Sequence, residues 1–192
     1  MPIIGSLAGA SSRGLGGLIT FGSPVVVGDF VALSTATITS PQFGITFDNV
    51  SQNYTHLHLR FRISTGAENS TRIFFNDDET HANYNYTWLQ GNGVSPYIFT
   101  QDTYSYFTYD NTTDSNLFVV GTVDIMDYTN TNKRKTFSSW SGWSSNAPQA
   151  VQNIVGTMWK NTSAINKIVI KPDSAQNFKV GSTVALYGIK SA

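Results

Sequence analysis

Three histidines are the first residues in this 192-residue chain whose type and spacing suggest chemistry. His56 and His58 are two residues apart, so an extended chain places both imidazoles on one face, about 6–7 Å apart. Such a pair can ligate a metal ion, with His81 as a third ligand. Arg60 and Arg62 follow on the same face, and cations beside a metal ion are unfavourable. We therefore expect solvated or loop-packed histidines, and no metal or other cofactor.

The carboxylates give no catalytic pattern. The acidic run Asp77-Asp78-Glu79 resembles part of a calcium loop but lacks its D-x-D-x-D-G spacing, so we expect a solvated turn, with calcium as the alternative. Asp124 and Asp127 are expected on opposite faces of a strand, where they cannot form an acid/base couple. The motifs GxSxG and HExxH and phosphate-cradling loops are absent. The chain is therefore not expected to be an enzyme.

Aromatic residues alternate with amide and hydroxyl side chains in several segments. Sugar rings stack their C–H faces on aromatic rings while neighbouring amides bond the sugar hydroxyls. Core packing and protein–protein contact are the preferred alternative, because Tyr and Trp also dominate interfaces. The residues selected for contact with a glycan or a protein are Tyr84, Tyr86, Trp88, Trp140 and Trp143.

The segment Thr55–Ser64 has the clearest structural pattern, because apolar and polar residues alternate through it. Side chains of a strand alternate between its two faces, so the pattern predicts a strand with one face in a core. The expected inward residues are Leu57, Leu59, Phe61 and Ile63, and the outward residues, a candidate interface, are His56, His58, Arg60 and Arg62. Residues 71–75 are expected to pair with this strand as a hairpin neighbour.

The composition predicts an all-β fold for residues 29–192. Thr, Val, Ile, Tyr and Phe, which suit a pleated surface, are plentiful, whereas Glu occurs only twice. About eight to ten short strands separated by turns favour an antiparallel β-sandwich or a jelly roll. Cysteine is absent, which excludes disulfides and thiolate metal sites.

The charge balance limits the partners. Twelve basic and twelve acidic residues cancel, which argues against nucleic acid and against an anionic membrane surface. No apolar run approaches the length of about 20 residues that a membrane-spanning helix needs. The N-terminus has neither the basic region nor the unbroken apolar run of a signal peptide, so we expect synthesis in a cytoplasm without ordinary secretion.

Residues 1–28 are expected to form an extended, Gly-rich N-terminal arm. Such a composition is typical of a flexible tail. The arm is also apolar enough to become ordered on a partner, and the two interpretations stand side by side. The residues selected as anchors are Ile3, Ile4, Leu7, Arg13, Leu15 and Leu18.

Further motifs are distributed over most of the chain. They are Gln52–Leu57, Phe75–Asp77 with Asn83–Tyr84, Asp127–Thr131 before the basic run Lys133–Lys135, Gly181–Ser182 with Leu186–Ile189, and Gly9–Gly17. Together they resemble small structural proteins of tailed bacteriophages, particularly those that infect cyanobacteria and other aquatic bacteria. None of these motifs marks a catalytic group.

The resemblance implies a virion component of the tail-fibre or capsid-decoration type, made in the cytoplasm of the host bacterium. It implies that the arm docks on other virion proteins and that the sandwich forms a homo-oligomer, with a trimer as the expectation. It also implies that the displayed domain touches host-surface polysaccharide. The alternative class is a free carbohydrate-binding module or a glycan-active enzyme.

Overall fold

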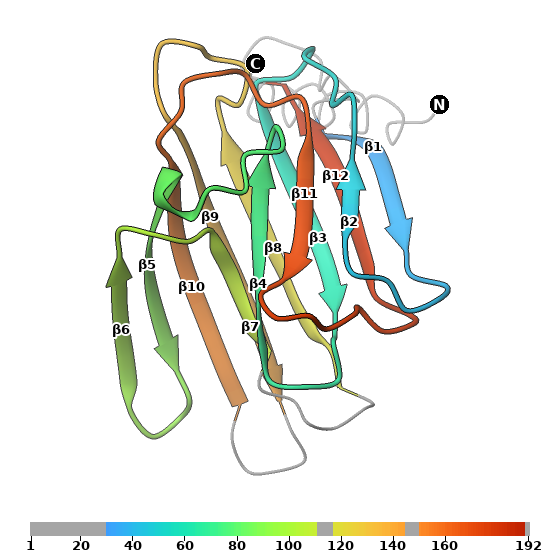
Figure 1. Ribbon diagram of the computed structural model, residues 1–192, viewed down its shortest axis with the longest axis vertical. Coiled ribbons are helices and arrows are strands. Elements are labelled where there is room, and N and C mark those ends of the chain that lie inside the picture. Colours follow the sequence, from blue (N-terminus) through green and yellow to red (C-terminus); the bar gives the residue numbers. More distant parts are fainter. Residues whose placement is uncertain (1–29, 111–116, 145–149, 191–192) are drawn as a thin grey trace, which may run out of the picture.

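The computed structural model describes residues 30–110, 117–144 and 150–190. They fold into two antiparallel sheets that pack face to face, which confirms the predicted all-β sandwich (Figure 1). The described residues contain twelve strands and one 3₁₀ turn, η1 (His81–Asn83). The proposed anchor residues of the arm, Ile3, Ile4, Leu7, Arg13, Leu15 and Leu18, lie outside the described residues.

The strands divide unequally between the sheets. The larger sheet contains β1 (Phe30–Thr37), β3 (His56–Ile63), β5 (Tyr84–Gly91), β6 (Pro96–Gln101), β8 (Val119–Met126), β9 (Lys135–Ser144), β10 (Ala150–Trp159) and β12 (Thr183–Ile189). The smaller sheet contains β2 (Ile45–Phe47), β4 (Asn69–Phe75), β7 (Tyr106–Asp110) and β11 (Ile168–Pro172). Their spatial orders are β1-β12-β3-β8-β9-β10-β5-β6 and β2-β11-β4-β7.

Eight of these strands pair as a jelly roll. β1 pairs with β12, β2 with β11, β3 with β8 and β4 with β7. When these eight strands are taken in chain order, the first pairs with the last, the second with the second-last, and so on to the middle. That pairing arises when one long hairpin is rolled into two sheets, which is the jelly-roll arrangement of two Greek keys. The predicted jelly roll is therefore confirmed.

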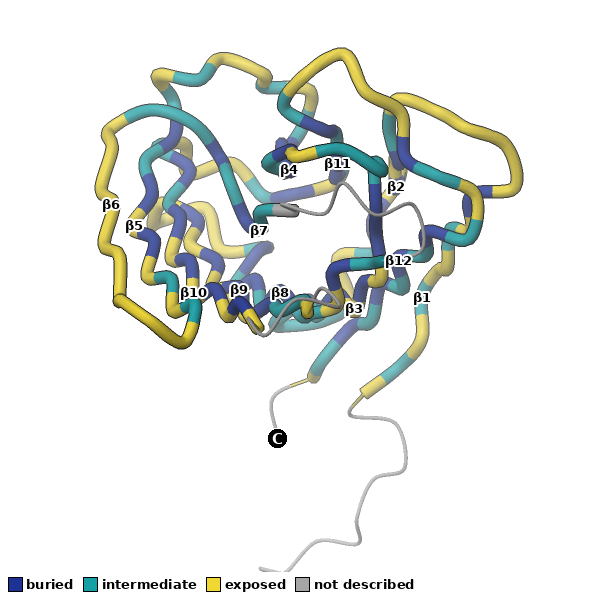
Figure 2. Tube along the Cα trace, turned by 90° about the horizontal axis from the view of Figure 1, so that it is seen from below, coloured by how far each residue is buried: buried dark blue, intermediate teal, exposed yellow. Residues whose placement is uncertain are grey.

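The hairpins β5–β6 and β9–β10 are additions to this jelly roll. They interrupt the chain between β4 and β7 and between β8 and β11, and they pair with each other through β5 and β10. Because β9 also pairs with β8, the added strands extend the larger sheet past the smaller one. Figure 2 shows β10, β5 and β6 curving round beside β7, and β6 is exposed along its whole length.

Strand β3 lies inside the larger sheet with its predicted faces. Leu57, Leu59, Phe61 and Ile63 are each at most 5% exposed, which places this face in the core. The predicted pairing of residues 71–75 with β3 is wrong. The chain crosses to the other sheet after β3, where β4 pairs with β11 and β7, and β3 pairs with β12 and β8. Loop length alone cannot distinguish a hairpin from such a crossing.

Candidate functional site

An aromatic cleft lies where the larger sheet extends past the smaller one. β7 is the edge strand of the smaller sheet, so the inner faces of β5 and β6 have no strand of that sheet above them. The cleft has a volume of about 260 Å³. It is lined by Ser70, Tyr86, Trp88, Gln90, Phe99, Tyr106 and Tyr109.

The strand period explains how these side chains meet. Tyr86 and Trp88 are two residues apart on the inner face of β5. Phe99 is the partner of Trp88 in the β5–β6 register, so its side chain emerges on the same face. The turn between the two strands is built from Asn92, whose Oδ1 accepts two backbone N–H bonds, and Gly93, whose φ is +80°.

The rings form a connected cluster with their edges and faces in contact. The centroid of Trp88 lies 6.3 Å from Tyr86, 6.3 Å from Tyr106 and 5.9 Å from Tyr109. Tyr86 and Tyr106 are 5.2 Å apart at an interplanar angle of 78°. Edge-to-face pairs of this kind are favourable beyond their buried area, so the wall of the cleft is held in one arrangement.

Asn153, on the neighbouring strand β10, holds two polar groups of the cleft through hydrogen bonds. Its Oδ1 accepts hydrogen bonds from Trp88 Nε1 at 3.1 Å and from Gln90 Nε2 at 3.0 Å. The residue is fully buried, and its Nδ2 has no hydrogen-bond partner among the described residues. A buried amide nitrogen without a partner is costly, and such groups often mark functional sites.

A charged network fixes the tyrosines at the edge of the cleft. The Tyr106 hydroxyl donates to Asp173 Oδ2 at 2.7 Å and accepts from Arg72 Nη2 at 3.3 Å, and Arg72 and Asp173 form an ion pair. The Tyr109 hydroxyl donates to Glu68. Burial raises the pKa of Tyr86, so its hydroxyl stays protonated at neutral pH. Arg72 and Asp173 thus compensate each other, and the residues that line the cleft are all uncharged.

The structure separates the five aromatic residues that were selected from the sequence. Tyr86 and Trp88 line the cleft, but each is only 7% exposed, because the two rings form a small hydrophobic cluster with Val155. Tyr84 is 0% exposed in the main core, with its hydroxyl bonded to the backbone of Phe75 and Asp78, so its selection for glycan contact is wrong. Trp140 projects from the opposite, outer face of the sheet, and Trp143 packs against the main core.

Phe99, Tyr106 and Tyr109 belong to the cleft but were not selected. Tyr106 and Tyr109 lie in a visibly aromatic segment, and the sequence does not indicate that β7 approaches β5. The signal near Phe99 is the Asn92-Gly93 pair between two strand-forming runs, which is typical of a hairpin. A two-residue turn there would pair Trp88 with Tyr97, whereas residues 92–95 form a longer loop and Trp88 pairs with Phe99.

The outward residues of β3 all have partners within the chain. His58 Nδ1 donates to Asp124 Oδ1 at 2.6 Å on β8. The guanidinium of Arg60 lies 5.6 Å from the ring centroids of both Phe30 and Tyr187. His58 and Arg60 thus contact neighbouring strands, while the side of β3 that was selected as a candidate interface keeps Arg60 and Arg62 exposed.

The two remaining outward residues are also engaged. Arg62 lies 3.4 Å from the Phe118 ring centroid and donates to the Gly181 carbonyl at 2.8 Å. His56 Nδ1 accepts the backbone N–H of Asp127 at 2.9 Å. The expectation that Asp124 and Asp127 lie on opposite faces is wrong, because β8 ends at Met126 and Asp127 turns back toward His56 with φ +48°.

The third histidine does not join the first two. His81 lies on η1, where its Nε2 is 2.7 Å from Arg72 Nη1 and accepts a hydrogen bond from it. Burial, and then the charge of Arg72, lower the pKa of His81, which keeps the imidazole neutral. Among the described residues, no group of three His, Asp or Glu side chains could hold a metal ion.

The acidic run is a structural turn whose carboxylates point to separate partners. Asp78 accepts hydrogen bonds from Trp159 Nε1 at 2.7 Å and from Asn83 Nδ2 at 2.9 Å, and these bonds contribute to a lowered pKa. Asp77 pairs with Lys167 at 2.8 Å, and Glu79 pairs with Lys171. Asp77 and Glu79 remain 65% and 48% exposed, as expected of a solvated turn, whereas Asp78 is held by Trp159 and Asn83.

No protein-family model matches this chain, and neither a curated protein nor a solved structure matches it. In the described part of the chain, no helix has the length and apolar character to cross a membrane. Function must therefore be argued from the geometry of the cleft and of the sheets.

Proposed function

We propose that this chain is a structural protein of a tailed bacteriophage particle whose jelly roll attaches to a neutral surface glycan through the aromatic cleft. The cleft is the observation that carries the proposal. Aromatic faces at its wall and hydroxyl and amide groups at its rim match the two faces of a sugar, one apolar and one polar.

The absence of charge on the cleft residues indicates the class of glycan. Ser70, Gln90 and the tyrosine hydroxyls are neutral hydrogen-bonding groups. Arg72, which could bind a carboxylate or a sulfate, is held by Asp173 and Tyr106 instead. A neutral polysaccharide is therefore the preferred ligand, and uronic or sulfated polymers are disfavoured.

The place in a virion is supported by the fold and by the composition. Jelly rolls serve in viral capsids and in lectins, which is an analogy at the level of fold. The sequence resemblance to phage structural proteins agrees with it. This analogy does not distinguish a tail-fibre protein from a capsid-decoration protein, so the proposal covers both.

Glycan binding is tested with two substitutions on strand β6. Phe99→Ala removes a half-exposed ring from the cleft, and Ile98→Ala, on the opposite face of the same strand, is the matched control. Loss of one stacking contact predicts about tenfold weaker binding of a short neutral oligosaccharide, selected on a glycan array and able to fill one cleft, for Phe99→Ala, and unchanged binding for Ile98→Ala. Trp88→Ala is less suitable, because Trp88 also bonds the buried Asn153.

Three outcomes would contradict this binding role. They are absence of binding to any neutral glycan, equal loss of binding in both variants, and release of reducing sugar from the polysaccharide. The last result would place the chain among glycan-active enzymes.

The virion role is tested separately by removal of the arm. A chain without residues 1–20 should keep its fold and its glycan binding but fail to enter particles, because the arm is proposed to dock on other virion proteins. Normal incorporation of the truncated chain would exclude this role of the arm. A free carbohydrate-binding module would bind glycan and enter no particle in either form.

A further inference from the structure

The outward face of β9, β10, β5 and β6, here called the uncharged face, takes no part in the cleft. We propose that this face binds a second copy of this chain across a two-fold axis. The contact does not depend on glycan binding, because the cleft opens on the other face of the same strands.

Charge distinguishes this face from the rest of the larger sheet. Lys135 is the one charged residue in these four strands, and it is 0% exposed. The other half of the sheet carries Arg60, Arg62 and the His58–Asp124 pair outward. Two identical surfaces that meet across a two-fold axis bring like charges together, and interface cores are depleted of charge. The uncharged face is suited to such a contact, and without cations it does not suit an anionic membrane.

An apolar ridge runs across the four strands of this face. Trp140, Ile154, Leu89 and Ile98 are direct neighbours in the strand register. Their exposed fractions are 65%, 53%, 46% and 71%. A contiguous exposed row of large apolar side chains, with polar residues around it, is typical of a protein–protein contact.

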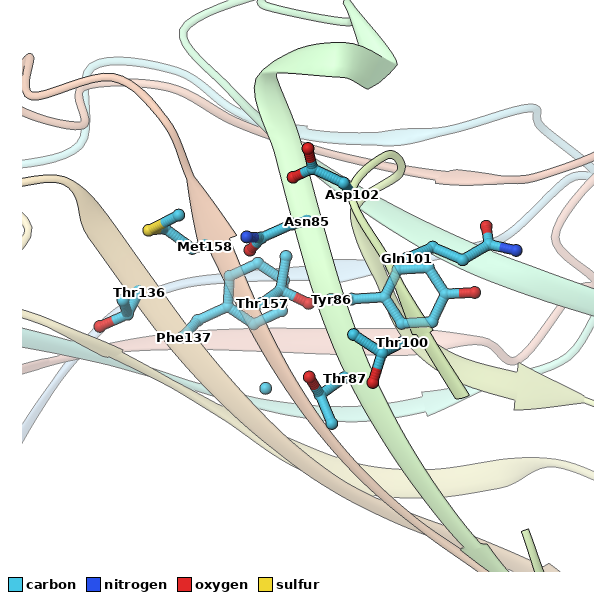
Figure 3. Close-up of a pocket in the computed structure, with 11 residues that line it drawn as sticks. Asn85, Tyr86, Thr87, Thr100, Gln101, Asp102, Thr136, Phe137, Thr157 and Met158 are labelled. Atoms are coloured by element: carbon cyan, nitrogen blue, oxygen red, sulfur yellow. The ribbon is translucent and has the colours of Figure 1, made fainter. Parts of the chain in front are cut away.

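Hollows lie on both sides of the ridge. One of about 360 Å³ includes Gly156 and is bordered by side chains from β9, β10, β5 and β6, among them Thr136, Met158 and Thr100 (Figure 3). Asp102, directly after β6, borders the end of this hollow and pairs with Lys160 at 2.8 Å. The other, of about 430 Å³, lies around Gly142 beside Trp140. A ridge flanked by hollows is self-complementary, because a two-fold axis parallel to the ridge seats the ridge of each copy in a hollow of the other.

Gly156 is not explained by the fold of one chain. A Cβ atom at this position would have no heavy atom within 4 Å, and its φ is not positive. The register of β10 with β9 and with β5 is continuous through it, so it does not form a bulge. Glycine weakens a strand, and where neither a bulge nor a bend requires it, it marks the close approach of another backbone or a ligand.

The area of the face reaches the smallest size expected of a specific contact. Four strands about 4.8 Å apart, with eight residues at about 3.4 Å each, cover about 500 Å². Two copies would bury about 1,000 Å² in total, which reaches the lower limit for a specific interface. The expected trimer would need a different, head-to-tail contact.

Sedimentation equilibrium of the full chain tests the proposal, with circular dichroism as the control for folding. The wild-type chain should have the mass of two copies. Gly156→Val fills a hollow and Ile98→Asp charges the ridge, and each should weaken association at least about tenfold. Ala32→Val adds bulk on the outward face of β1, and Phe99→Ala alters only the cleft, so both controls should remain dimeric.

A wild-type mass of one chain or of three chains would overturn the proposal. So would a dimer that persists in both Gly156→Val and Ile98→Asp. If the dimer forms as expected and no glycan binds, the glycan proposal fails and this one stands.

Discussion

At the scale of single residues, Lys135 is the one charged side chain that is fully buried in the described fold. Its ammonium donates to the backbone carbonyl of Thr162 at 2.7 Å and to those of Asn130 and Lys133. Burial, followed by the nearby charge of Lys133, lowers its pKa. Three carbonyls satisfy its three protons, and the turn before β9 is thereby joined to the loop after β10.

Lys135→Met should therefore lower the free energy of unfolding by about 2 kcal/mol, because the charge-assisted hydrogen bonds that join the turn before β9 to the loop after β10 are lost. Lys133→Met is the matched control: its side chain is 51% exposed and pairs with Asp127, so the expected loss is at most about 1 kcal/mol. Urea denaturation of both variants measures the difference. Equal losses would show that Lys135 does not fix the turn.

His81 should make stability depend on pH. Its folded-state pKa lies below the ordinary value of 6.5, because of burial and then of Arg72, with Glu79 opposing. The unfolded chain therefore binds the proton first, and stability falls as pH decreases below about 6.5. Carboxylates whose pKa is lowered, such as Asp78, also make stability fall with decreasing pH, but only in a more acidic range.

His81→Gln keeps an acceptor for Arg72 without a titrating group. The variant should lose less stability than the wild type between pH 7 and pH 5, as measured by thermal unfolding at each pH. Identical pH profiles would show that His81 is not responsible.

At the scale of elements, glycines in two strands of the larger sheet have opposite roles. A Cβ at Gly121 on β8 would overlap the Trp140 carbonyl and lie 2.7 Å from the Phe61 ring. Gly121 is thus required by the packing of β8 against β9, whereas Gly156 faces open space. The same residue type indicates packing in one case and an exposed hollow in the other.

Gly121→Ala should destabilise the chain by about 3 kcal/mol through overpacking. Gly156→Ala should stabilise it by about 0.5–1 kcal/mol, the usual difference between Gly and Ala inside an element. Denaturation at protein concentrations low enough for a single chain compares the two without the effect of association. A loss of stability in Gly156→Ala would mean that the hollow is not open in one chain.

The alternation in β3 was sufficient to predict its two faces, because the side-chain period of a strand is local. The fold class followed from composition and turn spacing in the same way. The order of the strands did not follow, since the pairing of β5 with β10 joins residues more than sixty positions apart. The local alternation is enough to select Tyr86 and Trp88, whereas the contacts of Trp88 with Tyr106 and Tyr109 depend on the long-range approach of β7.

At the scale of the whole molecule, the added hairpins give the jelly roll two surfaces. The inner face of β5 and β6 forms the cleft with β7, and the outer face carries the apolar ridge. A dimer through the outer face leaves both clefts accessible. Two clefts on one dimer would bind a repeating polysaccharide more strongly than one, if their spacing fits the polymer.

The four tryptophans allow the most direct test of glycan binding, because they lie in different environments. Trp88 is in the cleft, Trp140 on the ridge, Trp143 beside the main core and Trp159 inside it. Each gives one indole N–H signal in a nitrogen-15 NMR spectrum. Titration with a neutral oligosaccharide that binds on the array should shift the Trp88 signal in a saturable way and leave the Trp159 and Trp140 signals in place. An unchanged Trp88 signal, or a saturable shift of Trp140 alone, would contradict binding in the aromatic cleft.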